Sequence, residues 1–365
     1  MSKKKRALIV IGGTGGHVFP GCNLAKNLIE QDYIVKLVSD KRGYKYLNDY
    51  KNFKIYILPS SPFNQKNLFT IFLSLIIIFY SILRSIIFLL FNRPEIVFGM
   101  GGYASFPICI AASVLKIKFI IYENNLIIGK TNKLLLPFAK KIFVSNLRLE
   151  GIPSKYKNKI IEIGNIIKRE IINFSVSRSP KRENSKLNIL VLGGSQAAKV
   201  FAVILPKIFK SCVDNGIPVK IYQHCLHSQN EILKNFYENN NIDYETFNFS
   251  NNLSKYFEKA NFAITRSGSS ILAELTNSNV PFISVPLPSS ADKHQLKNAI
   301  FYERKKYAFL IEEKDLNLKF FDLIKNISEN SSILDAIIHN QRQYSDKNVY
   351  KNINLELKKI FNEKN

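Results

Sequence analysis

The sequence predicts an α/β protein with two doubly wound units, each containing a parallel sheet covered by helices. Three observations lead to this prediction. Short apolar runs alternate with helical stretches along the 365-residue chain, each half opens with a strand that runs into a glycine turn, and a polar segment at 174–187 lies between the halves. Alternating strands and helices are typical of parallel sheets with both faces covered. At roughly 150 residues per domain, the length fits two domains.

Seven strands are expected in the first half, as short runs rich in Ile, Val and Phe. They cover 7–11, 34–39, 54–58, 95–99, 118–122, 141–145 and 160–163. The pattern lapses near Asn165, so we expect a first domain at 1–165. Six further strands are expected at 187–192, 219–224, 244–247, 262–265, 281–285 and 308–311, with a charged helix after Lys347. The second domain is therefore expected at 166–345.

The stretch Leu68–Phe91 is long enough to cross a membrane, and its few polar residues are Thr70, Ser74, Ser81, Arg84 and Ser85. Their spacing places them on one narrow stripe of a helix. Three interpretations remain open: a packed helix with a face that touches a membrane, a helix of the core, and a true span. The first is favoured, because a span would separate the first three strands from the rest of their sheet.

The net charge of +24 implies an anionic partner, such as nucleic acid, an acidic membrane or a phosphate group, although a coding bias toward lysine accounts for part of it. The four cysteines show no CxxC spacing, which argues against a disulfide framework or a zinc site and fits a reducing cytosol. The basic N-terminus precedes an apolar run too short for a signal peptide.

Glycine turns follow strands at four places. The first, Gly12–His17, leads from a strand into a helix, where backbone amides can approach an anion. It lacks the Gly-Lys-Ser/Thr of a P-loop, and Val18 stands where the dinucleotide fingerprint has its third glycine. The second turn, Gly99–Ser105, would lie at the same sheet edge, where open α/β sheets bind ligands.

The other two turns lie in the second half. Gly193–Ala198 opens its first helix, and Thr265–Glu274 runs through Ser-Gly into another helix. Glu274 could accept both hydroxyls of a ribose, or could simply be an acid on a helix surface. Farther along, the amides of Gln295 and Asn298 could bind sugar hydroxyls.

Together these motifs resemble the MurG family, peripheral membrane glycosyltransferases that transfer GlcNAc from UDP-GlcNAc to undecaprenyl-diphosphate-linked MurNAc-pentapeptide. The resemblance covers nearly the whole chain, and six sites match in order. They are Gly12–His17, Gly101–Ser105, Tyr122–Asn125, Gly193–Ala197, Arg266–Glu274 and Asp292–Ala299.

The resemblance implies a GT-B fold, with two Rossmann-like domains facing a cleft and the C-terminal helix 346–365 crossing back to the first. By motif position, Ser195 would hold the donor diphosphate, Glu274 the ribose and Ser250 the uracil. Ser269 belongs to the same donor site, and Gln295 with His294 would bind the GlcNAc hydroxyls. The first domain, which faces the acceptor and the membrane, would contribute Thr14, Gly15, Gly16 and Asn125.

Three departures from the family pattern matter. The family's Gly-Asn-Pro-Val-Arg is here Gly164-Asn165-Ile166-Ile167-Lys168-Arg169, so either Lys168 or Arg169 would meet the diphosphate. Lysine supplies charge without the bidentate fork of arginine. The family's His-Glu-Gln-Asn is here Tyr122–Asn125, and Ala197 replaces a glycine.

The chemistry expected at such a site needs a stabilised diphosphate and a base. The sequence has no Asp-x-Asp, so neither a metal nor another cofactor is expected beside the UDP-GlcNAc donor. Helix N-termini after Gly194 and Gly268 could stabilise the leaving group. His17 is the first candidate for the base and Glu123 the second. The resemblance implies inversion by single displacement.

Residues 130–170 carry ten basic and three acidic residues, a charge suited to anionic headgroups. We therefore expect peripheral attachment to the cytoplasmic face of the inner membrane. Two other enzyme classes stay open, a GT-B enzyme with a lipid acceptor such as diacylglycerol and a UDP-GlcNAc epimerase. A nucleic-acid-binding protein is not favoured, because the sequence has no such motif and its glycine turns would be unexplained.

Overall fold

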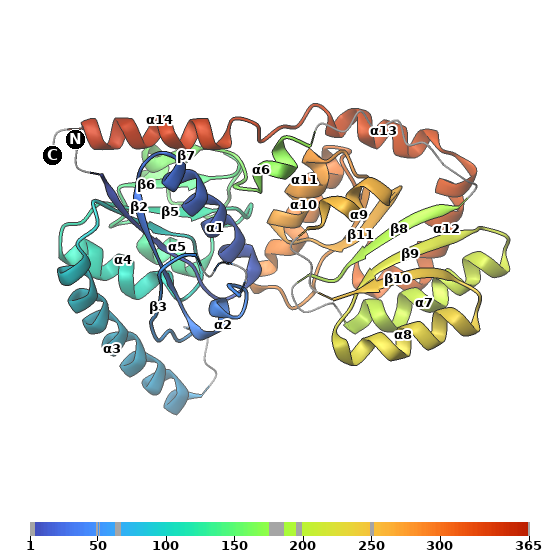
Figure 1. The fold of residues 1–365 in the computed structure, drawn as a ribbon, viewed down its shortest axis with the longest axis horizontal. Coiled ribbons are helices and arrows are strands. Elements are labelled where there is room, and N and C mark those ends of the chain that lie inside the picture. The colour runs from blue at the N-terminus through green and yellow to red at the C-terminus, as the bar shows by residue number, and fades with distance from the viewer. Residues whose placement is uncertain are drawn as a thin grey trace. The chain divides into compact units, whose positions relative to one another are not determined.

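The computed structural model describes residues 4–48, 50, 52–62, 67–174, 186–194, 199–248 and 252–363. The chain divides into two compact units, Met1–Lys168 with Asp346–Asn365 and Arg169–Ser345. Each contains one parallel sheet, of seven and six strands, with helices on both faces (Figure 1). The predicted α/β class with two doubly wound sheets is confirmed. The polar segment at 174–187, which suits either an interdomain linker or a surface loop, lies mostly outside the described residues.

The sheet of the first unit has the strand order β3-β2-β1-β4-β5-β6-β7. The chain order reverses between β1 and β4, which pair directly, with Val10 opposite Gly99. This pair is therefore the switch point of the sheet, where ligands bind in open α/β folds. The strands are β1 Arg6–Val10, β2 Ile34–Ser39, β3 Ile55–Ile57, β4 Ile96–Gly99, β5 Phe119–Glu123, β6 Lys141–Val144 and β7 Ile160–Glu162.

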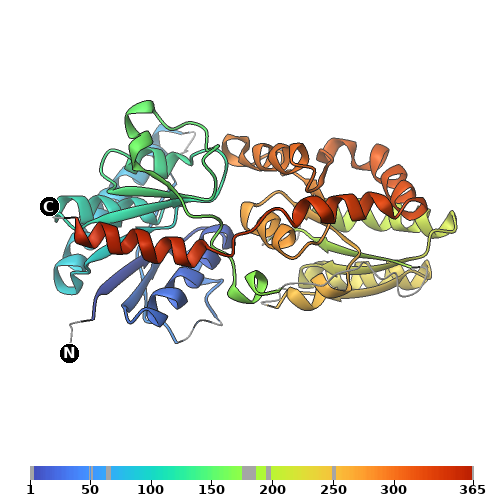
Figure 2. The same ribbon diagram turned by 90° about the horizontal axis from the view of Figure 1, so that it is seen from above.

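Helices cover both faces of this sheet. On one face, α3 Leu68–Asn92, α4 Ser105–Val114 and α5 Lys130–Leu135 share an apolar core with the strands. On the other, α1 Gly15–Glu30 lies beside the C-terminal helix α14 Val349–Asn362 (Figure 2), where Asn27 Nδ2 donates to Asn354 Oδ1 at 2.9 Å. Short helices lie at α2 Lys41–Tyr44 and, as a 3₁₀ turn, at Ser154–Lys159.

The second unit repeats the plan, with the strand order β10-β9-β8-β11-β12-β13 and its switch point between β8 and β11. Its strands are β8 Leu187–Leu192, β9 Val219–His224, β10 Asp243–Phe247, β11 Phe262–Arg266, β12 Phe282–Val285 and β13 Phe309–Leu310. Its helices are α6 Arg169–Ile172, α7 Lys199–Asp214, α8 His227–Asn239, α9 Ser254–Lys259, α10 Ser269–Asn277, α11 His294–Arg304, α12 Leu316–Glu329 and α13 Ser332–Gln341.

Helix α3 has an unusual distribution of polar residues, because its serines face the protein and its large apolar side chains face outward. Ser81 and Ser85 are 0% exposed, whereas Leu68 and Phe91 are 84% and 86% exposed. The Ser81 hydroxyl donates to the Pro59 carbonyl at 2.7 Å, so the buried polar groups are satisfied. The interpretation of this segment as a core helix is therefore wrong. Of the predicted polar stripe, the three serines lie on the buried face, whereas Arg84 is exposed.

Helix α3 is long and apolar enough to cross a membrane by length and composition. However, it connects β3 to β4, and both strands belong to the sheet built around β1. A span would place the two ends of α3 on opposite sides of a bilayer and would divide that sheet. The folded unit is therefore incompatible with a span, and the exposed apolar face needs another explanation.

Candidate functional site

The two glycine turns of the first unit meet at the carboxyl edge of β1 and β4. His17, in the first turn of α1, is half-buried and packs against the second turn. A Cβ atom at Gly101 would lie 2.8 Å from the His17 ring, and Gly101 and Gly102 both have positive φ angles. Glycine is therefore required at Gly101 by both space and backbone conformation. The structure brings together Thr14, Gly15, Gly16 and His17 with this second turn.

The first glycine turn is held from below by Asp40, which is only 2% exposed. Its Oδ1 accepts from the Gly13 and Gly43 amides at 3.0 and 2.7 Å, and its Oδ2 accepts from Ser60 Oγ at 2.8 Å. Burial alone would raise the pKa of Asp40, but these hydrogen bonds and the Arg42 charge outweigh it and lower the pKa below 3.8. Asp40 thus shapes the first glycine turn.

Glu123, at the end of β5, is 3% exposed and organises the loop that follows it. Its Oε1 accepts from the Asn125 backbone and side-chain amides at 3.1 and 3.0 Å. Its Oε2 accepts from the Gly129 amide at 2.9 Å and Asn132 Nδ2 at 3.0 Å. Next to it, Asn124 Nδ2 donates to the Gly16 carbonyl at 3.2 Å, which joins this loop to the start of α1.

The two candidate cations lie where the first unit ends. Lys168 is the last residue of the first of the unit's two chain segments and is half-buried after the buried pair Ile166 and Ile167. Arg169 is exposed and begins α6 of the second unit. The two neighbours therefore differ in anchoring, since the backbone just before Lys168 is fixed in the core of the first unit.

The second unit builds its site around the Ser267-Gly268 turn between β11 and α10. The Ser267 amide donates to Gln295 Oε1 at 3.2 Å, and the same oxygen accepts from the Leu287 amide at 2.9 Å. Asn298 Nδ2 donates to the Ser267 carbonyl at 3.1 Å. Gln295 and Asn298 thus lock this turn, and Gln295 keeps its Nε2 group as the donor that could meet a ligand.

The remaining predicted residues of this unit lie around the same turn. Ser269 is buried in the first turn of α10, and Glu274 is half-buried in that helix. His294 begins α11, with its Nδ1 2.7 Å from the Ala291 carbonyl. Ser195 and Ser250 lie outside the described residues. Within the part of the chain that the structure describes, no group of three His, Cys, Asp or Glu side chains could hold a metal ion.

Sequence reasoning gave no role to Arg266, which braces the end of β11. The residue is 7% exposed, and its guanidinium pairs with Glu313 and lies 4.8 Å from the centre of the Phe201 ring. Its Nη1 also lies 3.4 Å from the Val285 and Pro286 carbonyls. Its place directly before Ser-Gly was the only signal, because the distant acid Glu313 is not marked by any local pattern.

Two parallel α/β units with ligand turns at their switch points are the GT-B architecture, and the family comparisons identify the chain as a glycosyltransferase. Residues 7–144 match the glycosyltransferase family 28 N-terminal domain, and residues 188–353 match the family 28 C-terminal domain. The chain belongs to glycosyltransferase family 28.

Relatives across nearly the whole length are named UDP-N-acetylglucosamine–N-acetylmuramyl-(pentapeptide) pyrophosphoryl-undecaprenol N-acetylglucosamine transferase. One from Pelagibacter ubique is 35% identical over 98% of this chain and 99% of its own. One from Rickettsia canadensis is 34% identical over 92% and 94%.

Solved structures share the fold. MurG of Acinetobacter baumannii aligns with a TM-score of 0.74 at 23% identity, covering 96% of this chain and 98% of its own. A UDP-GlcNAc 2-epimerase from Neisseria meningitidis bound to UDP-GlcNAc aligns with a TM-score of 0.65 at 14% identity, covering 97% and 100%.

Proposed function

We propose that this enzyme transfers GlcNAc from UDP-GlcNAc to undecaprenyl-diphosphate-MurNAc-pentapeptide, forming the disaccharide lipid used in peptidoglycan synthesis. The observation that carries the proposal is the 35% identity to a transferase of that name over 98% of the chain. The epimerase alternative rests only on structures at 13–14% identity, which share the fold.

The donor is assigned to the second unit. Glu274 accepts hydrogen bonds from the ribose hydroxyls, and the turn carrying Ser269 points the N-terminal amides of α10 at the diphosphate. Gln295 Nε2, beside His294, binds the hydroxyls of GlcNAc. Ser195 and Ser250 complete the donor site at the diphosphate and uracil.

The acceptor is assigned to the first unit, in the loops that carry Thr14, Gly15, Gly16 and Asn125. We assign the general base to His17, because its ring lies at the surface where both glycine turns meet, whereas all four hydrogen bonds of the Glu123 carboxylate go to the protein. Glu123 then acts by shaping the loop of Asn125. An uncharged imidazole can take a proton near neutral pH.

In the proposed reaction, the 4-hydroxyl of MurNAc attacks C1 of GlcNAc while its proton passes to His17. A C1–O4 bond forms as the bond from C1 to the UDP oxygen breaks, and a single displacement inverts C1. The electron pair leaves on the diphosphate, whose charge is stabilised by α10 amides and by Lys168. No step requires a metal ion, because these groups supply the positive charge.

The test is UDP release from UDP-GlcNAc with and without the lipid-linked acceptor. The wild type is expected to release UDP only with the undecaprenyl-diphosphate acceptor and not with diacylglycerol. Glu274→Ala is expected to lower kcat/KM for UDP-GlcNAc by about tenfold or more, through lost hydrogen bonds to the ribose. Release that does not depend on the acceptor would contradict the function, and an unaffected Glu274→Ala enzyme would contradict only the ribose assignment.

We further infer that the first unit attaches peripherally to the cytoplasmic leaflet through α3. Exposed side chains Phe72, Phe79 and Leu83 form part of its outer face, while Ser74 and Ser81 on its other face bond the loop that follows β3. A continuous exposed apolar face on a protein surface is typical of an interaction site. The lysine-rich surface near α4 supplies the charge that favours an anionic membrane over an apolar protein partner.

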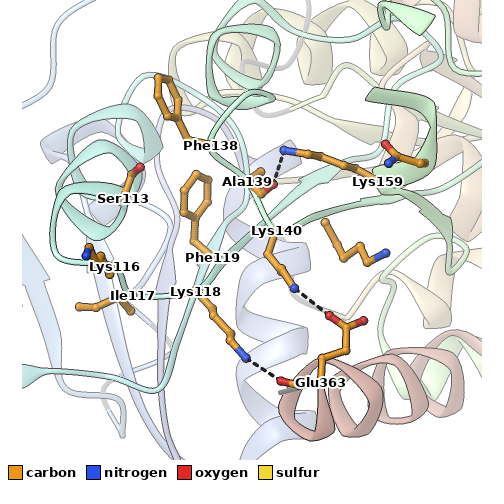
Figure 3. Close-up of a pocket in the computed structure, with 12 residues that line it drawn as sticks. Ser113, Lys116, Ile117, Lys118, Phe119, Phe138, Ala139, Lys140, Lys159 and Glu363 are labelled. Carbon is orange, nitrogen blue, oxygen red and sulfur yellow. Dashed lines mark hydrogen bonds and ion pairs between the residues drawn. The ribbon is translucent and has the colours of Figure 1, made fainter. Parts of the chain in front are cut away.

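That lysine-rich surface lines a hollow of about 460 Å³ between α4, β6 and the end of α14 (Figure 3). Its lysines are Lys116, Lys118, Lys140, Lys141 and Lys159. Lys159 donates to three carbonyls, and Lys140 pairs with Glu363 at 2.7 Å. The side chains of Lys116 and Lys141 make no hydrogen bond or ion pair with the other described residues, so they are available to headgroup phosphates.

Flotation with vesicles tests this attachment. Serine at Phe72, Phe79 and Leu83 together should weaken binding to anionic vesicles roughly a hundredfold or more, because each exposed apolar side chain contributes about 2 kcal/mol when buried. The matched control places serine at Ile232 and Leu318, which are 70% and 74% exposed on the second unit. Protein that resists extraction by salt and carbonate would contradict peripheral attachment.

A further inference from the structure

The chain leaves and re-enters the first unit at one buried point, where Asn165 meets Asp346. The Asn165 amide donates to Asp346 Oδ1 at 2.8 Å, and Asp346 is 4% exposed. Gly164 has a φ of +96°, and a Cβ there would lie 2.7 Å from the same oxygen. The segment 164–168 is therefore held by a carboxylate that lies 181 residues away in the sequence.

Two tyrosine hydroxyls hold the next two residues of this segment. The Ile166 amide donates to Tyr122 Oη at 3.0 Å, and Tyr350 Oη donates to the Ile167 carbonyl at 2.5 Å. Ile166 and Ile167 are 2% and 1% exposed, so water cannot replace these bonds. Burial raises the pKa of Tyr122, which keeps its hydroxyl protonated.

Lys168 follows directly after these held groups. Side chains, and not a strand or helix, satisfy the amides of Asn165 and Ile166 and the carbonyl of Ile167, so their bonds set the path of the backbone into Lys168. Tyr122 also immediately precedes Glu123 on β5, so it is part of the strand that organises the Asn125 loop. Tyr122 thus lies next to Glu123, which holds the Asn125 loop, and also bonds the backbone two residues before Lys168.

We propose that Tyr122 is a positioning residue, which holds the Ile166 amide and thereby places Lys168 for the donor diphosphate. The inference rests on the proposed function only for the identity of the ligand. Ile166 stands where the family pattern quoted above has proline, and proline has no amide hydrogen. Tyr122 therefore satisfies a donor that exists because this chain has isoleucine at that position.

Because the bond from Ile166 to Tyr122 needs the Ile166 amide, variants at these two positions can be compared to test it. Tyr122→Phe leaves the Ile166 amide buried without an acceptor, and Ile166→Pro removes that amide. Tyr122→Phe should therefore weaken UDP binding when Ile166 is kept and should change it little in the Ile166→Pro background. Tyr350→Phe is the matched control, because the Ile167 carbonyl it bonds is still present after Ile166→Pro.

The experiment measures binding of UDP and of uridine by calorimetry, together with the KM of the lipid acceptor, in these variants. Tyr122→Phe should raise the Kd for UDP about tenfold, because a displaced Lys168 loses roughly one charge-assisted hydrogen bond to the diphosphate, and leave the Kd for uridine within about twofold. In the Ile166→Pro background, Tyr122→Phe should change the Kd for UDP less than about twofold, whereas Tyr350→Phe should cost as much as in the wild type.

Three results would overturn the proposal: an unchanged Kd for UDP in Tyr122→Phe, an equal loss of uridine binding, or an undiminished penalty in the Ile166→Pro background. If Tyr122→Phe alone does not fold, the comparison within the Ile166→Pro background decides. Because UDP binding is measured without an acceptor, wild type that binds UDP but shows no acceptor-dependent release would contradict the proposed function and leave this inference standing.

Discussion

The two units support their ligand turns with different chemistry. In the first unit, the buried carboxylates Asp40 and Glu123 accept hydrogen bonds from backbone amides on either side of the switch point. In the second, the neutral amides of Gln295 and Asn298 hold both the amide and the carbonyl of Ser267. The folds are alike, but buried carboxylates hold the turns of the first unit, whereas neutral amides hold the Ser267 turn of the second.

This difference between carboxylate and amide supports indicates which unit should lose more stability when a charge is removed. Hydrogen bonds and the Arg42 charge outweigh burial and lower the pKa of Asp40, which favours its charged form. Removing an acceptor from either carboxylate leaves donors unsatisfied. A neutral amide makes weaker bonds and is insensitive to pH. We therefore expect the loops of the first unit to be more easily damaged by substitution and by acid.

The largest effect is expected for Glu123→Gln. Its Oε2 would become an amide group facing two donors, so the first unit should lose about 3 kcal/mol of stability. The matched change in the second unit is Gln295→Glu, which keeps an oxygen for Ser267 and Leu287 and should cost less. Urea unfolding followed by circular dichroism measures both, since the chain has no tryptophan. Equal losses would remove the proposed difference between the units.

Asp40→Asn should cost about 2 kcal/mol, because it weakens bonds from Gly13, Gly43 and Ser60 to a charged acceptor. It also predicts a pH dependence. The pKa of Asp40 is lower in the folded protein than its ordinary value of 3.8, so its contribution is complete above that value. It is lost as the pH falls through the folded pKa. The Asp40→Asn protein should lack this component of acid unfolding.

Gly101→Ala should lower stability by roughly 1–2 kcal/mol through its left-handed backbone, and activity by an order of magnitude or more, since the new methyl displaces His17. Gly216→Ala is the control. Its φ of +73° gives similar strain, but no atom lies within 4 Å of the added Cβ. Acceptor-dependent UDP release should fall in the first variant only, and equal activities would mean that the position of His17 does not matter.

The sequence predicted the sheets well because buried parallel strands are nearly continuous apolar runs. All 13 strands in the described part of the chain lie where those runs occur, and Ile34–Ser39 has the predicted bounds. The motifs also located the turns, since glycine is needed where His17 approaches Gly101. What local patterns could not show was which polar residues serve the protein itself. Asp40, Glu123 and Asn298 are bonded to backbone groups outside their own strands and helices, and those partners become visible only after folding.

The smallest effect is expected for Glu363→Gln, which separates burial from charge. Glu363 bonds Lys140 at 2.7 Å, a shorter contact than any that Glu123 makes, yet its side chain is 43% exposed. The hydrogen bond from Lys140 is the main cause that lowers the pKa of Glu363. Water nevertheless competes for both groups, because they are exposed. Unfolding in about 0.15 M salt should therefore be unchanged, while flotation with anionic vesicles should increase slightly as one negative charge leaves the lysine hollow. A loss of stability comparable to that of Glu123→Gln would mean that charge pairing, and not burial, determines how the first unit depends on its carboxylates.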